Sequence, residues 1–259
     1  MPSLDIRRVN VVQYLQPFRE GGSMPGLVKG DDDFMYVLKF RGAGQGKKAL
    51  IAELIGGEVA RLIGLKVPEL VFMDLDDSFN KTEPDQEIQD LLKFSVGLNL
   101  GLHFLSSAMT YDPLVSETDS LTASKVVLLD SILTNIDRTA KNTNLLIWNK
   151  ELWLIDHGAC LYFHHNWNNW EGQLKRTFPA VKDHVLLTKA NDLGLAATEL
   201  KQTITEDKLR QIVDAIPEEW LTEESNPLPP AEMRTAYVAV LLAKVNNIDA
   251  LVKEAADAR

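Results

Sequence analysis

Residues 134–158, TNIDRTAKNTNLLIWNKELWLIDHG, decide the fold because a dense polar segment precedes two short apolar runs and a final acid. The runs LLIW and LWLI, separated by residues 149–151, predict a β-hairpin. A turn centred near Lys150 would make the numbers of paired residues sum to about 300, with Asn144 opposite Asp156. The hairpin would therefore fold Asp156 back onto the polar segment.

Three side chains that carry oxygen are expected to meet where the hairpin returns: Asp137, Asn142 and Asp156. Carboxylate and amide oxygens suit magnesium that is bound together with substrate phosphates. Asn142 and Asp156 would then hold the metal, while Asp137 would accept or orient a hydroxyl proton, as phosphoryl transfer requires. The alternative is that these residues only satisfy the hydrogen bonds of a turn between a helix and a strand.

A lysine in an apolar strand is the second notable feature. Residues 34–40 predict a strand in which Lys39 shares one face with apolar side chains. A buried ammonium group requires a nearby anion. Glu53 of the following helix is the best candidate, and Glu58 is the second. Such a pair would aim the lysine at nucleotide phosphates, whereas the alternative is a solvated lysine and a surface glutamate.

A glycine-containing turn, GGSMPG at residues 21–26, lies before that strand. The backbone of Gly21 and Gly22, with the hydroxyl of Ser23, would be able to fold over phosphates. The turn matches neither of the two common phosphate-binding glycine patterns, and Pro25 removes an amide donor. A simple hairpin turn is therefore the alternative.

Composition and charge exclude several classes of protein. The chain of 259 residues carries a net charge of −10, which disfavours binding to nucleic acid or to anionic lipid. The single cysteine, Cys160, offers neither an internal disulfide nor a zinc cluster, as expected in a reducing compartment. No apolar run approaches the roughly 18 residues of a membrane span, and the N-terminus lacks the apolar core of a signal peptide. These features predict a cytoplasmic protein without a membrane span.

The remaining pattern predicts mixed α and β structure. A helix is expected to end at Gly64, followed by a strand within residues 67–75 and an acidic, solvated connection over 76–90. A second helix is expected at 121–135 with a serine or threonine N-cap. The chain from Trp167 onward is expected to be mostly helical, with a proline-rich interruption.

Taken in order, the glycine turn, the strand lysine, the helix glutamate, D-R-T-x-x-N at 137–142 and D-H-G at 156–158 resemble the HipA-like kinases. The segment ELIGGEVARLIGLKVPE at 53–69 is similar to the helix of that family that ends in a Gly-Leu-x-Val-Pro turn. The sequence lacks the H-R-D, D-F-G and A-P-E signatures of typical eukaryotic protein kinases. Gly158 also stands where HipA has an aspartate.

The resemblance implies an α+β, two-lobed protein-kinase-like fold. Residues 1–100 would form a small N-lobe with a β-sheet and one helix, and residues 101–259 a larger, mostly helical C-lobe with the catalytic-loop hairpin. ATP and Mg²⁺ would bind between the lobes. The γ-phosphoryl group would pass to an unidentified hydroxyl, with a protein serine or threonine as the favoured acceptor. The alternatives are a small-molecule or lipid kinase, and a non-catalytic ATP-binding module that regulates a partner protein.

The resemblance also assigns roles to individual residues. Asp137 corresponds to the catalytic aspartate, Asn142 and Asp156 to the metal ligands, and Lys39 to the lysine that contacts the ATP phosphates. Glu53 corresponds to the acid that pairs with this lysine. These residues, with the glycine turn at 21–23, form the predicted nucleotide site.

Other polar residues allow more than one interpretation. Adjacent histidines on an extended segment point to opposite faces, so His164 and His165 are not expected to share a metal with His157. Asp130 is expected to hydrogen-bond the catalytic loop from within a helix. Arg138 would either neutralise nearby carboxylates or contact a phosphate.

Overall fold

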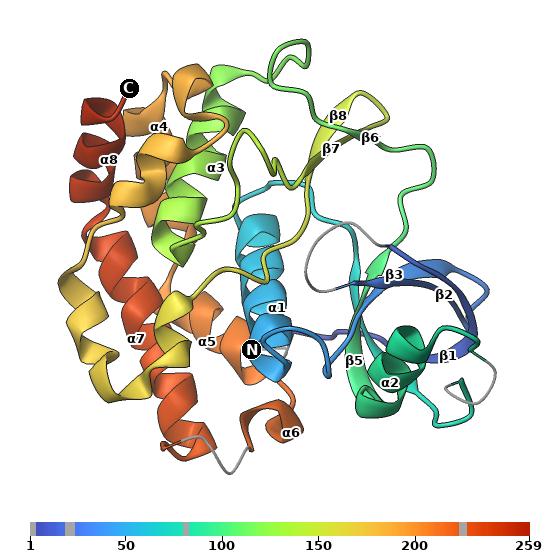
Figure 1. Ribbon diagram of the computed structural model, residues 1–259. Coiled ribbons are helices and arrows are strands. Elements are labelled where there is room, and N and C mark those ends of the chain that lie inside the picture. The colour runs from blue at the N-terminus through green and yellow to red at the C-terminus, as the bar shows by residue number, and fades with distance from the viewer. Residues whose placement is uncertain (1–3, 19–23, 80–82, 223–226) are drawn as a thin grey trace.

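The computed structural model describes residues 4–18, 24–79, 83–222 and 227–259. A small β-barrel stands beside a group of helices, and one long helix lies between these two parts (Figure 1). The barrel is built from five strands in the order β1-β2-β3-β5-β4, in which only β1 and β4 run parallel. These strands are β1 (Arg8–Pro17), β2 (Gly26–Gly30), β3 (Met35–Lys39), β4 (Leu70–Leu75) and β5 (Gly97–His103).

Alternation along β3 decides which side chains enter the barrel. Tyr36 and Leu38 are fully buried inside it, whereas Lys39 lies on the opposite face, as the period of two predicts. The strand thus carries its lysine outward to a cavity.

Helix α2 (Gln86–Phe94) corrects two expectations about the barrel region. Part of the acidic stretch predicted to be a solvated connection is helical, and the described part of residues 1–100 contains two helices rather than one. The Asp85 side chain caps α2 by accepting a hydrogen bond from the Glu87 N–H, and Ile88, Leu91 and Leu92 pack against the barrel core. The expected boundary at residue 100 lies within β5, which continues to His103.

Helix α1 (Lys47–Leu62) connects the barrel to the helical part. Every residue from Leu50 to Ala60 is buried, because α1 packs against β5 on one side and α3, α5 and α6 on the other. The helical part contains α3 (Ser120–Leu133), α4 (Leu193–Thr203), α5 (Glu206–Asp214), α6 (Glu218–Leu221), α7 (Pro230–Asn246) and α8 (Ile248–Asp257). The N-cap of α3 is Asp119 rather than a serine or threonine.

The predicted hairpin is present as β7 (Leu145–Trp148) and β8 (Glu151–Leu154), next to the short β6 (Met109–Thr110). Asn149 and Lys150 form its two-residue turn with φ of 51° and 66°, as the twist of a tight hairpin requires. The register differs by one residue from the expected one. Asn144 therefore faces Ile155, whose N–H donates to the Asn144 carbonyl, and not Asp156.

The segment between the hairpin and α4 consists mainly of short helices, in agreement with the helical structure expected from Trp167 onward. It forms short 3-10 helices: η2 (Tyr162–His165), η3 (Trp167–Asn169), η4 (Glu171–Lys175), η5 (Pro179–Asp183) and η6 (Leu187–Lys189). α-Helical structure resumes only at Leu193. Among the described residues no single helix has the length and apolarity to cross a membrane, although α7 and α8, bent by 61°, pass that test as a pair.

Candidate active site

A cavity of about 1320 Å³ brings the predicted site residues together. Its lining comes from β3, β5, the first half of α1, the polar segment before β7 and the segment after β8. Lys39, Glu53, Asp137, Asn142 and Asp156 all line it. The predicted residues Gly21, Gly22 and Ser23 lie outside the residues that the structure describes.

Lys39 contacts two carboxylates in this cavity. Its Nζ lies 2.6 Å from Asp156 Oδ1 and 3.7 Å from Glu53 Oε2. Burial lowers the pKa of Lys39, but Glu53 and Asp156 outweigh burial and raise the pKa above its usual value. The pair with Glu53 is therefore present as expected, whereas Glu58 pairs with Arg61. The closer contact to Asp156 was not predicted.

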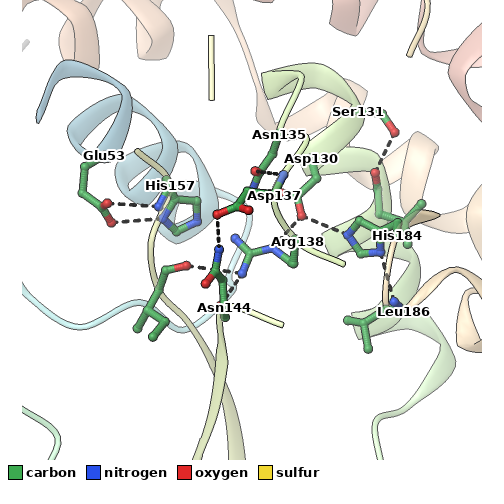
Figure 2. A network of polar contacts seen from close by, with 12 residues as sticks. Glu53, Asp130, Ser131, Asn135, Asp137, Arg138, Asn144, His157, His184 and Leu186 are labelled. Atoms are coloured by element: carbon green, nitrogen blue, oxygen red, sulfur yellow. Dashed lines mark hydrogen bonds and ion pairs between the residues drawn. The ribbon is translucent and has the colours of Figure 1, made fainter. Parts of the chain in front are cut away.

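Glu53 is almost fully buried and makes a second contact that sequence reasoning missed. Its Oε2 accepts a hydrogen bond of 3.0 Å from the His157 backbone N–H, and its Oε1 lies 3.5 Å from His157 Nδ1 (Figure 2). Burial alone would raise the pKa of Glu53, but Lys39 and then His157 lower it to about 2. Glu53 is thus ionised, and it contacts both Lys39 of β3 and His157 in the segment after β8.

Two amides hold the Asp137 carboxylate. Asn142 Nδ2 donates to Asp137 Oδ2 at 2.8 Å, and Asn144 Nδ2 donates to the same oxygen at 3.1 Å. The Asp137 N–H in turn donates to Asn135 Oδ1 at 3.1 Å. Asp137 and Asn142 therefore meet as predicted. Asn144 was not predicted to take part, although it belongs to the same asparagine-rich segment.

A buried ion pair lies beneath this loop. Arg138 Nε donates to Asp130 Oδ2 at 2.6 Å, and neither side chain is exposed. Arg138 Nη1 donates to the carbonyl oxygens of Asn144 and Ile155, which flank the open end of the hairpin. Arg138 therefore neutralises a carboxylate and joins the two hairpin strands. Asp130 reaches the loop from α3, as expected.

His184 completes the network around Asp130 and was not identified from the sequence. The Leu186 N–H donates to His184 Nδ1, which places the ring proton on Nε2, and Nε2–H donates to Asp130 Oδ2 at 2.9 Å (Figure 2). Burial would raise the pKa of Asp130, but Arg138 and His184 outweigh burial and hold that pKa well below its usual range. The loop that carries Asp137 is thus supported by an ionised, hydrogen-bonded Asp130.

The histidines at 164 and 165 have a structural setting. His164 is buried, and its Nδ1 contacts the Tyr237 hydroxyl in α7. Phe163 and Trp167 pack edge to face and surround the same tyrosine ring. Among the described residues no group of three or more histidine, cysteine, aspartate or glutamate side chains is placed to hold a metal.

The donors that face the cavity fit a magnesium ion bound with phosphates. Magnesium is usually held by one or two carboxylates together with substrate oxygens, rather than by a complete protein cage. Asp156 offers a carboxylate, Asn142 offers an amide oxygen, and both line the cavity next to Lys39. The site therefore has the ligand chemistry of a metal that arrives with a nucleotide.

Solved structures that resemble this fold include kinases. The proinflammatory kinase CtkA of Helicobacter pylori superposes with a TM-score of 0.63 at 14% identity, over 99% of each chain. The Golgi casein kinase with Mn and ADP bound gives a TM-score of 0.52 at 11% identity, over 98% of this chain and 74% of that chain. At such identities the likeness concerns the fold, which is mixed α/β and kinase-like.

The family follows from the sequence itself. The profile of the HipA-like kinases matches residues 11–250, which is most of the chain. The protein belongs to the HipA-like kinase family, and it is a phosphotransferase. No curated protein matches the sequence.

Proposed function

We propose that this kinase transfers the γ-phosphoryl group of ATP to a hydroxyl in a magnesium-dependent reaction, with a protein serine or threonine as the favoured acceptor. One observation carries the proposal: Lys39, Asp137, Asn142 and Asp156 line a single cavity. A lysine, two carboxylates and an amide in one cavity are the groups that phosphoryl transfer uses for positioning and charge stabilisation.

The proposed metal site consists of Asn142 and Asp156. Magnesium bound there would neutralise charge on the phosphates. Lys39 would contact a phosphate oxygen in place of its present partner Asp156, from which it is separated by 2.6 Å. Glu53 would remain beside the lysine and keep its ammonium group directed into the cavity.

Asp137 is the proposed base or orienting group for the acceptor hydroxyl. The amides of Asn142 and Asn144 both bind Oδ2, so Oδ1 is the oxygen that would receive the hydroxyl proton. The ion pair of Arg138 with Asp130 supports this role, because it fixes the loop that carries Asp137 to a buried carboxylate of α3. A well-held base reduces the motion needed to reach the reactive geometry.

The two-lobed arrangement is part of the same proposal. The barrel region would form the N-lobe that covers the phosphates, and the helical region with the hairpin would form the C-lobe that carries Asp137 and both metal ligands. The separate core cluster of the barrel supports this division. The end of β5 at His103 suits the lobe boundary better than residue 100 does.

Two alternative functions give different results in the same experiments. A non-catalytic ATP-binding module that regulates a partner would bind nucleotide without transferring phosphate, and the presence of Asp137, Asn142 and Asp156 argues against it. A small-molecule or lipid kinase would transfer phosphate to a different acceptor. The net charge of −10 disfavours an anionic membrane surface as the substrate.

Substitution of the proposed base tests the function. Asp137→Asn keeps the size of the side chain and should slow transfer from labelled ATP by about 10²- to 10⁴-fold in single-turnover measurements with protein acceptors. The variant should still be stabilised by Mg-ATP, by about 2.7 kcal/mol at a ligand concentration of 100 times Kd. Asp183→Asn, at an exposed position, is the matched control.

Two results would contradict the proposal. Transfer by Asp137→Asn at the rate of the unmodified protein would remove Asp137 from the reaction. Absence of any thermal stabilisation of the unmodified protein by Mg-ATP would remove nucleotide binding itself.

A further inference from the structure

The contact between α1 and the D-H-G segment at 156–158 joins two parts of the site that the proposed function treats separately. His157 is fully buried against α1, and Glu53 on that helix binds its backbone N–H at 3.0 Å (Figure 2). We propose that the His157 ring, which packs against Gly56, positions the neighbouring Asp156 so that its carboxylate can bind the metal. This inference rests on the proposed function, because it assigns Asp156 to the metal.

The fit between His157 and α1 depends on a glycine. A Cβ atom added at Gly56 would lie 2.6 Å from His157 Cβ and 3.0 Å from its Cγ, which is far inside normal contact. The neighbouring Gly57 differs, because a Cβ atom there would approach the Leu70 Cδ1 methyl group at 2.8 Å. A methyl group at the end of a leucine is able to move, whereas the Cβ of His157 moves only with its backbone. Gly56 therefore sets the distance between α1 and the segment that carries Asp156.

The ring acts mainly through its shape. Among the described residues neither His157 ring nitrogen makes a hydrogen bond, and the distance of 3.5 Å from Nδ1 to Glu53 Oε1 is longer than a strong contact. The backbone N–H of residue 157 would donate to Glu53 whatever the side chain is. The imidazole ring thus acts by filling the space next to Gly56.

Asp156 requires such support because of its own backbone. Its φ of 57° lies in the left-handed region, which costs free energy for a residue with a side chain, although aspartate adopts it more readily than most residues. On one side the Ile155 N–H is bound to the Asn144 carbonyl, and on the other side His157 is bound to α1. The packing of His157 against α1 is thus one of two contacts of the flanking residues that keep the Asp156 carboxylate directed at the cavity.

A pair of adjacent glycines provides the test. Gly56→Ala and Gly57→Ala should each favour the helix equally, but only Gly56→Ala pushes His157 and therefore Asp156. We expect Gly56→Ala to weaken binding of Mn²⁺ in the presence of ADP by about tenfold, the scale seen when support of a metal ligand is lost. Gly57→Ala should keep the affinity of the unmodified protein. Free Mn²⁺ is measured directly by electron paramagnetic resonance on the full chain.

Substitutions of the histidine keep the test valid if Gly56→Ala does not fold. His157→Ala removes the ring and should weaken Mn²⁺ binding by about tenfold. His157→Phe keeps a ring of similar size and should restore the affinity. In phosphoryl-transfer assays, a saturating metal concentration should restore most of the rate of the variants that bind Mn²⁺ more weakly. The substitutions lower the affinity for the metal but leave the proposed base, Asp137, unchanged.

The outcomes separate this inference from the proposed function. Mn²⁺ affinity in His157→Ala equal to that of the unmodified protein would overturn the inference. Equal weakening by Gly56→Ala and Gly57→Ala would do the same, since it would indicate a general effect on α1. If the unmodified protein bound no Mn²⁺ in the presence of ADP, the proposed function would fail and the inference with it.

Discussion

Replacement of Arg138 by methionine should destabilise the protein by about 3–5 kcal/mol, because it removes one partner of a buried ion pair. Arg138 and Asp130 both have side chains with no exposed surface, and Arg138 Nε lies 2.6 Å from Asp130 Oδ2. Methionine has a similar length and fills much of the same space. The change therefore removes the charge and the hydrogen bonds while it limits the loss of packing.

The structure indicates the lower end of that range. Asp130 would keep hydrogen bonds from Asn135 at 3.0 Å and from His184 at 2.9 Å, so its carboxylate would not be wholly unsatisfied. The carbonyls of Asn144 and Ile155 would lose the Arg138 donor. For a domain of this size, about 3 kcal/mol corresponds to a fall in Tm of about 6–12 °C.

Equilibrium unfolding in urea and thermal melting measure the loss. Arg210→Met is the matched control, because Arg210 is exposed and forms only an i,i+4 pair with Glu206. Such surface pairs contribute about 0.3–0.5 kcal/mol, so the control should change little. A loss for Arg138→Met below about 1 kcal/mol, or one equal to that of the control, would refute the claim that this buried pair supports the loop that carries Asp137.

Two further predictions concern the helical part. Burial lowers the pKa of Lys244 to about 8, so between pH 8 and 10.5 this lysine binds more protons in the unfolded chain, and its own contribution to stability should rise with pH. Lys244→Met should lose this rise in urea unfolding measured across that range, whereas exposed Lys253→Met should keep it. Trp220 of α6 is buried and donates to a carbonyl of β5, so Trp220→Ala should cost about 3–5 kcal/mol by thermal and urea unfolding. Tyr162→Ala, at a ring that is 61% exposed, should cost far less, and equal losses would contradict the role given to α6.

Local patterns were sufficient to predict the elements that carry the site. The alternation that puts Lys39 on the outer face of β3 is a property of any strand, and the i, i+4 spacing within α1 follows from its helical period. The two apolar runs around Asn149 and Lys150 predicted the hairpin. For these elements the sequence contains the whole physical reason for the structure.

Contacts between distant segments were harder to predict. His184 lies 54 residues after Asp130, and nothing local marks it as a partner. The contact of Glu53 with His157 spans 104 residues and needs the packing of α1 to create it. Helix α2 was missed because Ile88 is the one buried residue of the helix that lies within the acidic stretch at 76–90, a stretch that also suits a loop.

The one-residue error in the hairpin register had a clear cause. The turn uses two residues, Asn149 and Lys150, where three were expected. Asn144 consequently faces Ile155, and its side chain is available to hold Asp137. An error of one residue in the predicted turn length is thus the reason why Asn144 was not predicted as part of the site.

The position of α1 has a consequence for synthesis of the chain. This helix is made early, yet part of its surface is covered by α5 and α6, which begin only at Glu206 and Glu218. A nascent chain that ends before these helices leaves apolar surface of α1 open to solvent and to other chains. The lysine and glutamate of the site are therefore present long before the packing that holds them is complete. Truncation near residue 200 should yield an aggregation-prone fragment rather than a smaller active kinase.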